Sequence, residues 1–250
     1  MNRIKELVLD LTVLNKEKRF EQLCKVLKLN NLDFYIEEDK DNTRNIIIKL
    51  RNSSNSKSLK HIVLGAHYDI FPNSLGFNDN TIAVAMLIEF AKTYKGEVPI
   101  NIVFFDKEES GMIGSDNYTS NYEHEIYFAL IFDIIGFGDT LVVSSTDEVL
   151  KELLYTNFGI KALNFPLPSD NLVFSRKGIP TALITATNST DLQKIPNKAH
   201  IHYVASSAKF YRTFHGRELD NDITILNFDL AEGLLDKLST MFSIDHKKEK

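Results

Sequence analysis

Apolar side chains recur every three or four positions near the start of the chain, at Ile4, Leu7, Val8, Leu11, Phe20, Leu23, Val26 and Leu27. This spacing is typical of amphipathic helices, so we predict one or two helices within residues 3–29. Two short runs, 33–36 and 45–50, then favour an antiparallel pair of strands joined by a charged connection. The polar stretch 52–60 is predicted to be a loop.

From residue 61 the pattern changes to short apolar runs that alternate with helical segments. The predicted strands are 62–66, 100–105, 127–134, 140–144 and 181–185. The predicted helices are 81–94, 114–122, 147–158 and 223–242. Such alternation favours a mixed, mostly parallel β-sheet with helices on both faces, which is a three-layer α/β sandwich. Without a visible repeat or linker, residues 1–250 are predicted to be a single domain with a frayed charged tail at 246–250.

Composition narrows the classes of partner. The 250 residues are 43% hydrophobic, enough for one substantial core, and 29 Lys and Arg face 34 Asp and Glu for a net charge of -5. No long basic cluster is present, which argues against a nucleic acid partner. Glu6 and Asp10 interrupt the apolar run that a secretory signal needs, and no stretch reaches membrane-spanning length. We therefore expect a cytoplasmic protein without a membrane partner; the oligomeric state is open.

Acids and histidines follow the predicted strands of the sheet. They are His67, Asp69, Asp79, Glu108, Glu109, Asp133 and, late in the chain, His215. Ligands of open α/β sheets bind at the carboxyl ends of the strands, where these side chains would meet. Gathered carboxylates repel one another unless a cation neutralises them. Histidine and carboxylate donors without cysteine fit zinc, or less specifically cobalt or manganese, and this set is large enough for two ions.

Each motif taken alone also has a structural explanation. His67 is explained by a hydrogen bond to a nearby acid, Asp79 by a helix N-cap, and the pair Glu108-Glu109 by a solvated turn. An exposed position explains His215 equally well. Asp133 follows the apolar run ending at Phe132, and a carboxylate in such a place needs a strong partner. Neighbouring residues that leave a strand point in different directions, so Glu108-Glu109 can supply both a metal ligand and a base.

The order of these motifs carries a family resemblance. The matching stretches are GAHYD, GFNDNTIAVAMLIEFA, VFFDKEESGMIGS, IFDIIG, SDNLVFSRKGIP and TFHGRELD. Across residues 62–222 the sequence resembles metallopeptidase family 28, the co-catalytic zinc aminopeptidases. The resemblance implies the zinc-exopeptidase fold, also described as phosphorylase/hydrolase-like. It further implies a metal site built from His67, Asp79, Glu109, Asp133 and His215, with Asp79 bridging two zinc ions. Glu108 is implied as the general base and Asp69 as the acid that orients His67.

The sequence departs from the family pattern around the last histidine. Many relatives have a tyrosine there whose hydroxyl steadies the oxyanion, but Phe214 has none to donate. Tyr203 and Tyr211 are alternative sources from the same segment. Two further differences concern aspartates. The aspartate that closes the histidine motif stands later, at Asp220 or Asp222, and Asp170-Asn171 replaces Asp-His.

The other histidines offer no complete ligand set. His61 and His124 flank predicted strands and are expected at the surface. His200 and His202 would lie on one face of a strand, but no third ligand accompanies them. We therefore expect these two in an exposed loop.

The combined prediction is zinc-dependent hydrolysis of an N-terminal peptide bond. Two zinc ions would activate a water molecule and polarise the carbonyl, while Glu108 transfers the proton. The expected partner is a peptide or aminoacyl substrate whose ammonium group the acidic rim attracts. One alternative is a single-zinc glutaminyl-peptide cyclotransferase with ligands Asp79, Glu109 and His215, although the chain lacks the tryptophan those enzymes use. The other is a noncatalytic binding protein on the same fold.

Overall fold

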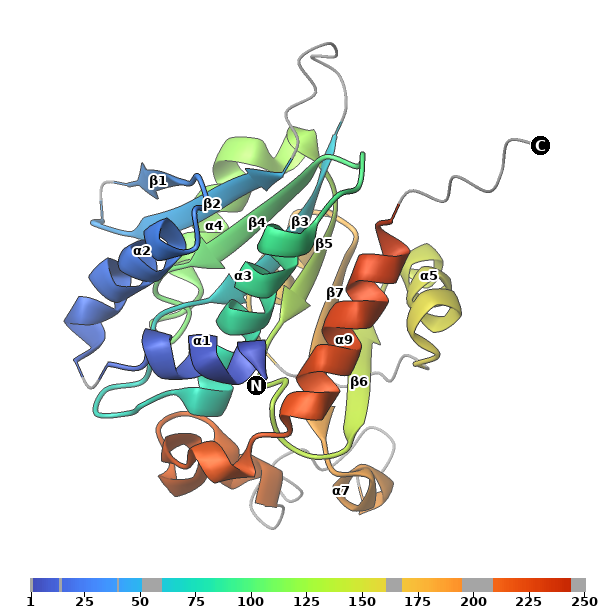
Figure 1. Ribbon diagram of the computed structural model, residues 1–250. Coiled ribbons are helices and arrows are strands. Elements are labelled where there is room, and N and C mark those ends of the chain that lie inside the picture. Colours follow the sequence, from blue (N-terminus) through green and yellow to red (C-terminus); the bar gives the residue numbers. More distant parts are fainter. Residues whose placement is uncertain are drawn as a thin grey trace.

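The computed structural model describes residues 2–13, 15–39, 41–50, 60–160, 168–194 and 209–243. Seven strands form one sheet in the order β1-β2-β4-β3-β5-β7-β6 (Figure 1). Their bounds are β1 Tyr35–Glu38, β2 Arg44–Leu50, β3 His61–His67, β4 Ile100–Phe105, β5 Ile126–Phe132, β6 Thr140–Ser145 and β7 Thr181–Thr187. The predicted loop at 52–60 and tail at 246–250, and also His200, His202 and Tyr203, lie largely or wholly outside the described residues.

The four central strands β4, β3, β5 and β7 run parallel, whereas β1, β2 and β6 pair antiparallel at the two edges. Every residue of β3 and of β4 is buried, as expected for parallel strands covered on both faces. The predicted mixed sheet flanked by helices is confirmed. The predicted strand 127–134 ends earlier, at Phe132, so Asp133 lies just beyond the carboxyl end of β5.

Helices cover both faces of the sheet. Their bounds are α1 Arg3–Leu11, α2 Arg19–Leu29, α3 Ile82–Thr93, α4 Ile113–Tyr122, α5 Glu148–Phe158, α6 Asn171–Arg176, α7 Ser189–Lys194 and α9 Phe228–Met241. On one face, buried side chains of α1, α2, α3, α5 and α9 join the larger apolar core. On the other face, Tyr118 of α4 and Phe174 of α6 pack against β-strand side chains in a second core. These two cores make the three layers visible in Figure 1.

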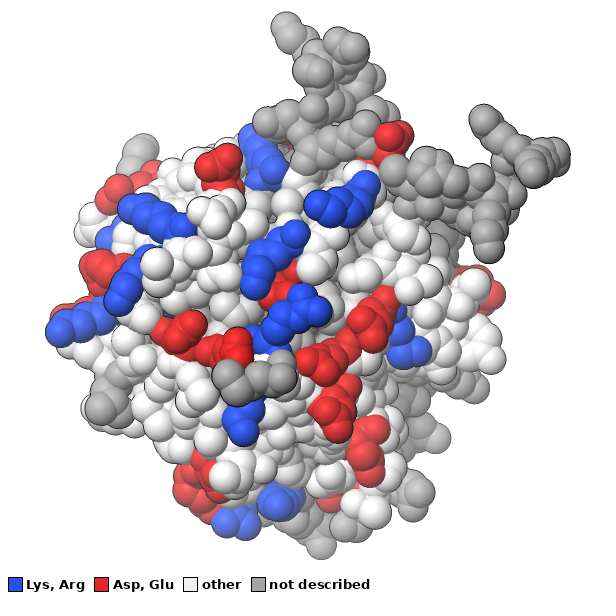
Figure 2. All heavy atoms as spheres, viewed as in Figure 1, with Lys and Arg blue, Asp and Glu red and all other residues white. Residues whose placement is uncertain are grey.

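The described residues also form short helical turns: η1 Lys16–Lys18, η2 Phe77–Thr81, η3 Glu123–Glu125, η4 Lys209–Thr213, η5 Glu218–Asn221 and η6 Ile223–Ile225. The last helix begins at Phe228, five residues later than predicted, because Asn227 caps it through a hydrogen bond from the Leu230 N–H. On the helical face in Figure 2, basic and acidic side chains are interspersed. Among the described helices, none is both long and apolar enough to cross a membrane.

One sequence expectation about the surface is wrong. His61 was expected to be exposed, but its side chain is buried and its Nε2 lies 3.0 Å from the Tyr118 hydroxyl. Strand β3 begins at His61 beneath helix α4, so the ring fills space between sheet and helix. The other flanking histidine, His124, is exposed as expected.

Candidate metal centre

The predicted site residues gather at one end of the sheet. His67 is the last residue of β3, Glu108 and Glu109 follow β4, and Asp133 follows β5. Asp79 lies in η2, and His215 follows η4 in the segment coloured orange below the sheet in Figure 1. Parallel strands bring the first four positions together, since the carboxyl ends of β4, β3 and β5 share one edge.

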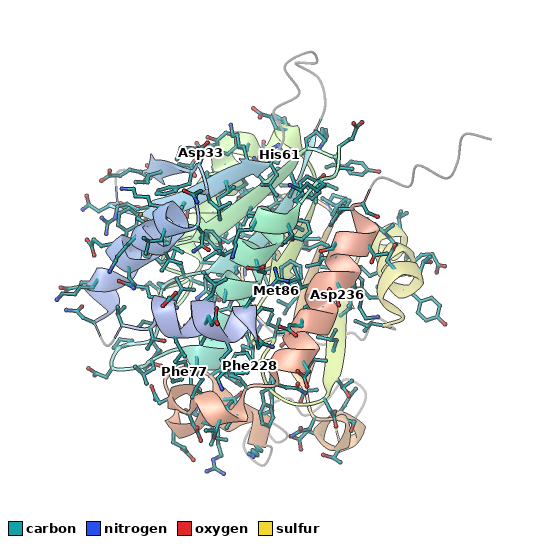
Figure 3. The ribbon with its side chains drawn as sticks, viewed as in Figure 1. Asp33, His61, Phe77, Met86, Phe228 and Asp236 are labelled. Atoms are coloured by element: carbon teal, nitrogen blue, oxygen red, sulfur yellow. The ribbon has the colours of Figure 1, made fainter. Side chains whose placement is uncertain are left out.

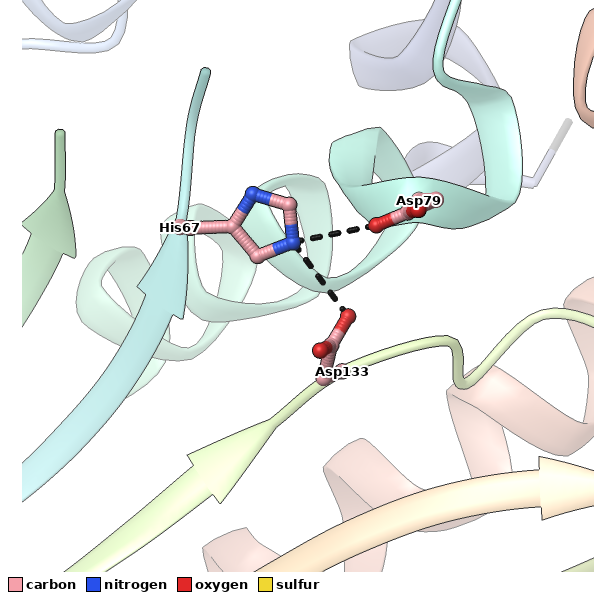
Figure 4. A group of neighbouring side chains, drawn as sticks. All are labelled: His67, Asp79 and Asp133. Atoms are coloured by element: carbon pink, nitrogen blue, oxygen red, sulfur yellow. Dashed lines mark hydrogen bonds and ion pairs between the residues drawn. The ribbon is translucent and has the colours of Figure 1, made fainter. Parts of the chain in front are cut away.

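Three side chains form a first group of ligand atoms (Figure 4). His67 Nε2 lies 3.1 Å from Asp79 Oδ1 and 3.3 Å from Asp133 Oδ1. All three residues are buried, and their ligand atoms lie within 4.8 Å of one another. One imidazole nitrogen and two carboxylates are donors that zinc accepts.

A second group shares one residue with the first. The ligand atoms of Asp79, Glu109 and His215 also lie within 4.8 Å of one another. His215 Nε2 is 4.0 Å from Glu109 Oε2, and the backbone N–H of His215 donates to Asp79 Oδ2 at 2.8 Å. The buried Glu109 Oε1 has no hydrogen-bond partner among the described residues, as expected of an oxygen that binds a cation. The two groups of possible ligand atoms thus share Asp79, and their nitrogen and oxygen donors fit zinc.

Asp69 connects the first ligand to the loop of glutamates. Its Oδ1 accepts the Glu108 N–H at 3.0 Å and its Oδ2 accepts the Glu109 N–H at 3.2 Å. The same carboxylate lies 3.4 Å from His67 Nδ1, which also lies 3.1 Å from the Asp69 carbonyl oxygen. Asp69 thus contacts the ring nitrogen of His67 that faces away from the ligand group.

The electrostatics of the cluster indicate an excess of negative charge. Burial, together with the charges of neighbouring carboxylates such as Asp79 and Asp133, raises the pKa of Glu108 to about 10 and that of Glu109 to about 8. Burial alone would lower the pKa of His67, but the adjoining acids, Asp133 first, raise it well above its ordinary value. Protons on these groups supply charge that a bound cation would supply instead.

Of the two aspartates that follow the histidine motif, Asp220 is the one that bonds to the site segments. Its Oδ1 accepts the Asn78 N–H at 3.2 Å and the Asp79 N–H at 3.0 Å, and its Oδ2 accepts the Gly216 N–H at 3.2 Å. Asp220 therefore ties η2 to the residue that follows His215. Asp222 instead caps η6 at the surface by accepting the Thr224 N–H.

One buried acid was noted in the sequence only as a departure from the family motif. Asp170 is fully buried before α6, and burial, followed by the charges of Asp69 and Asp133, raises its pKa to about 7. It also contributes to the raised pKa of Glu108, which places it in the same electrostatic cluster. The sequence shows an aspartate at position 170, but this position does not directly follow a strand, so the strand-end rule did not place Asp170 near the other acids.

The aromatic residues beside His215 pack on one another. Phe214 and Tyr211 have ring centroids 5.4 Å apart, and the Arg217 guanidinium lies 3.5 Å from the centroid of the Tyr211 ring. A role for Tyr211 in place of the missing Phe214 hydroxyl stays a prediction. On the other side, Phe71 stacks on His215 with ring centroids 6.1 Å apart.

Comparison with known sequences identifies a family whose match includes these residues. The sequence model of peptidase family M28 matches residues 45–218, a segment that contains all seven predicted site residues. The chain belongs to peptidase family M28. The resemblance drawn from the motifs is therefore confirmed.

Proteins similar to this M28 chain in sequence or in fold include aminopeptidases and a glutaminyl cyclase. Aminopeptidase YwaD of Bacillus subtilis is 26% identical over 148 residues, which cover 58% of this chain and 31% of YwaD. The zinc aminopeptidase BSAP from Bacillus subtilis aligns with a TM-score of 0.64 at 19% identity, covering 82% of this chain and 51% of that chain. Glutaminyl cyclase from Macrostomum lignano aligns with a TM-score of 0.63 at 15% identity, covering 95% and 87%. Both solved structures share the fold, and the match spans about a third of YwaD.

Proposed function

We propose that this M28 chain is a zinc-dependent aminopeptidase that hydrolyses N-terminal peptide bonds. The observation that carries the proposal is the pair of ligand groups that share Asp79. His67 and Asp133 complete one group, and Glu109 and His215 complete the other. Zinc ions held there would polarise the scissile carbonyl and acidify the attacking water.

Glu108 is the general base of this proposal. It adjoins the ligand Glu109, and its N–H is held by Asp69 Oδ1 at 3.0 Å. Without metal its pKa of about 10 keeps the carboxyl protonated at neutral pH. Positive charge at the ligand groups favours the carboxylate, which then accepts a proton from water and delivers it to the leaving amine.

The acidic surroundings support an exopeptidase rather than an endopeptidase. A free N-terminus carries a positive charge at neutral pH, and Asp170 is a buried acid in the same cluster as Glu108. An internal peptide bond brings no such charge into the site. The proposed substrate is accordingly a peptide or an aminoacyl compound with an unblocked N-terminus.

Substitution of Glu108 by Gln tests the base. The amide keeps the size of the side chain but cannot accept the proton, so we expect kcat to fall at least about 10³-fold. Zinc content per chain, measured by mass spectrometry after reconstitution, should remain that of the wild type. Glu125→Gln, at an exposed position of η3, is the matched control and should retain both properties. Retained turnover in Glu108→Gln would remove Glu108 from the role.

Glutaminyl-peptide cyclisation is the second candidate, favoured by the glutaminyl cyclase fold neighbour. Asp79, Glu109 and His215 form a complete three-ligand group by themselves, which suffices for one zinc. Two zinc ions per chain and release of N-terminal amino acids support the aminopeptidase. One zinc and release of ammonia from an N-terminal glutamine would establish the cyclase instead.

A further inference from the structure

Arg19 is a buried cation near the proposed metal centre. It belongs to helix α2, which lies outside the segment that matches the family. Arg19, the first residue of α2, is 2% exposed, whereas the family match begins at residue 45. Its Nε donates to the Tyr68 carbonyl at 3.0 Å, and its Nη1 donates to the Leu11 carbonyl at 2.7 Å. Its Nη2 donates to the Thr81 hydroxyl. All three nitrogens of the guanidinium thus have acceptors inside the core.

A buried guanidinium stabilises the core less well than an apolar side chain does. Among the described residues no carboxylate lies within ion-pair distance of Arg19, and burying an unpaired charge costs several kcal/mol. Burial lowers the pKa of Arg19 to about 10, although Asp69 and Asp220 raise it, so the group stays charged at neutral pH. An apolar side chain of similar volume would serve packing alone equally well or better. The charge and the shape of the guanidinium therefore point to another role.

The acceptors of Arg19 flank two residues of the first ligand group. Tyr68 directly follows His67 at the end of β3, and Thr81 comes two residues after Asp79 in η2. The Thr81 hydroxyl, which accepts from Arg19, also donates to the carbonyl that precedes η2. A planar guanidinium holds its donors in a fixed fork, so its two bonds set the separation of the segments that they join.

We propose that Arg19 is a positioning residue of the metal centre, which fixes the separation of His67 and Asp79 from outside the metal-binding segment. This inference rests on the proposed function, because the two residues need a fixed separation only if they hold a common ion. The side-chain atoms that would share that ion already lie 3.1 Å apart. Arg19 does not touch substrate or metal; it acts through the backbone of β3 and the hydroxyl of η2.

The experiment compares Arg19→Met, Arg19→Lys and Arg3→Met with the wild type. Arg3→Met is the control, since Arg3 is an arginine of the other N-terminal helix, α1, and donates to Glu89 Oε1 at 2.9 Å, late in α3 and away from η2. Zinc affinity is measured by competition with a chelating indicator, and coordination geometry by the visible absorption of Co²⁺ added in place of zinc. Circular dichroism reports folding at the same temperature.

We expect Arg19→Met to weaken zinc binding about 10-fold to 100-fold, the range found for residues that orient ligands, and to shift the Co²⁺ spectrum. Arg19→Lys, which keeps the charge without the fork, should restore part of the affinity, and Arg3→Met should match the wild type. A folded Arg19→Met protein with wild-type affinity and spectrum would overturn the proposal.

A second variant covers the case in which Arg19→Met does not fold. Thr81→Val removes the hydroxyl acceptor and leaves the guanidinium in place, and we expect the same spectral shift with a smaller loss of affinity. Wild-type affinity and spectrum in a folded Thr81→Val protein would also overturn the proposal. A wild-type chain that binds no zinc at all would instead overturn the proposed function, and this inference with it.

Discussion

Two buried histidines occupy the two ends of the same strand. His61 begins β3 and His67 ends it, and their side chains are 8% and 1% exposed. In Figure 3, His61 is labelled near the top of the ribbon, and Phe77, the first residue of the turn that carries Asp79, is labelled well below it. His61 and His67 are thus the same residue type on the same strand, and both are buried. They differ in the side chains that surround them.

The neighbours decide the charge of each ring. Burial lowers the pKa of His61, and the positive charge of Lys49 lowers it further, to about 4. His61 is therefore neutral at pH 7 and contacts the hydroxyl of Tyr118. At the other end of β3, carboxylates led by Asp133 overcome the effect of burial and raise the pKa of His67. Burial alone therefore does not decide the charge of a histidine; at His67 the surrounding acids decide it.

The largest expected effect compares the loss of each ring. We expect His67→Gln to weaken zinc binding by more than about 100-fold, because a ligand contributes more than the residues that orient it, and to reduce turnover about 10³-fold. His61→Gln should change both by less than about twofold. Competition titration with zinc and initial rates on an aminoacyl substrate measure the two effects. Equal losses in the two variants would break the comparison.

The next effect separates the two ends by pH. The pKa of His61 is about 4 in the folded protein and near 6.5 when unfolded, so the unfolded chain takes up the proton first as pH falls. Stability contributed by neutral His61 is present above pH 6.5 and is lost between pH 6.5 and 4. At about 1.4 kcal/mol per pKa unit, the loss approaches about 3 kcal/mol. Urea unfolding of the wild type and His61→Gln at pH 7 and pH 4 measures it.

On going from pH 7 to pH 4, the free energy of unfolding of the wild type should fall by more than that of His61→Gln, because only the wild type loses the contribution of neutral His61. The subtraction removes the contribution of all other acids, which titrate alike in both proteins. His124→Gln is the control, because this side chain is 93% exposed and should show no such shift. A difference that is the same at both pH values would contradict the assignment of His61.

The sequence predicted the gathering of acids at the end of β3 much better than the surroundings of its start. Acids placed directly after strands are visible in the sequence, and the rule for parallel sheets brings them together without knowledge of any contact. Nothing similar marks the start of a strand. His61 has its partner 57 residues away on α4, so its flanking position looked like a surface position. The mixed sheet was predicted from short apolar runs that alternate with helical segments, and the prediction of the site used the ends of those same strands.

Residues that act on backbone groups were the hardest to predict. Arg19 bonds to two carbonyls and Asp220 to three N–H groups, and backbone partners leave no trace in residue type. One signal for Arg19 was present. It stands four positions before Leu23 on the helical face that Leu23 and Leu27 bury, where an apolar residue is expected. A charged residue in such a stripe indicates a buried acceptor nearby.

The smallest expected effect tests whether the two ends of β3 are independent. Asn101 Nδ2 donates to the Tyr118 hydroxyl at 3.1 Å, and the hydroxyl has its own proton to donate to neutral His61. Tyr118→Phe leaves both partners unsatisfied in the core, so we expect the free energy of unfolding to fall by about 1 to 2 kcal/mol. Tyr127→Phe, at an exposed position on β5, is the control and should change it little. Urea unfolding at pH 7 gives the values.

The zinc affinity of Tyr118→Phe is the second measurement, and it decides whether the two ends of β3 are independent. Among the described residues, the hydroxyl hydrogen-bonds to β3 only at its first residue, His61, so loss of its hydrogen bonds should lower stability without changing zinc affinity by more than about twofold. Weaker zinc binding would mean that strain travels along the five residues between His61 and the proposed metal ligand His67. The two histidines would then belong to one coupled network, and the difference in their neighbours would no longer suffice to explain their roles.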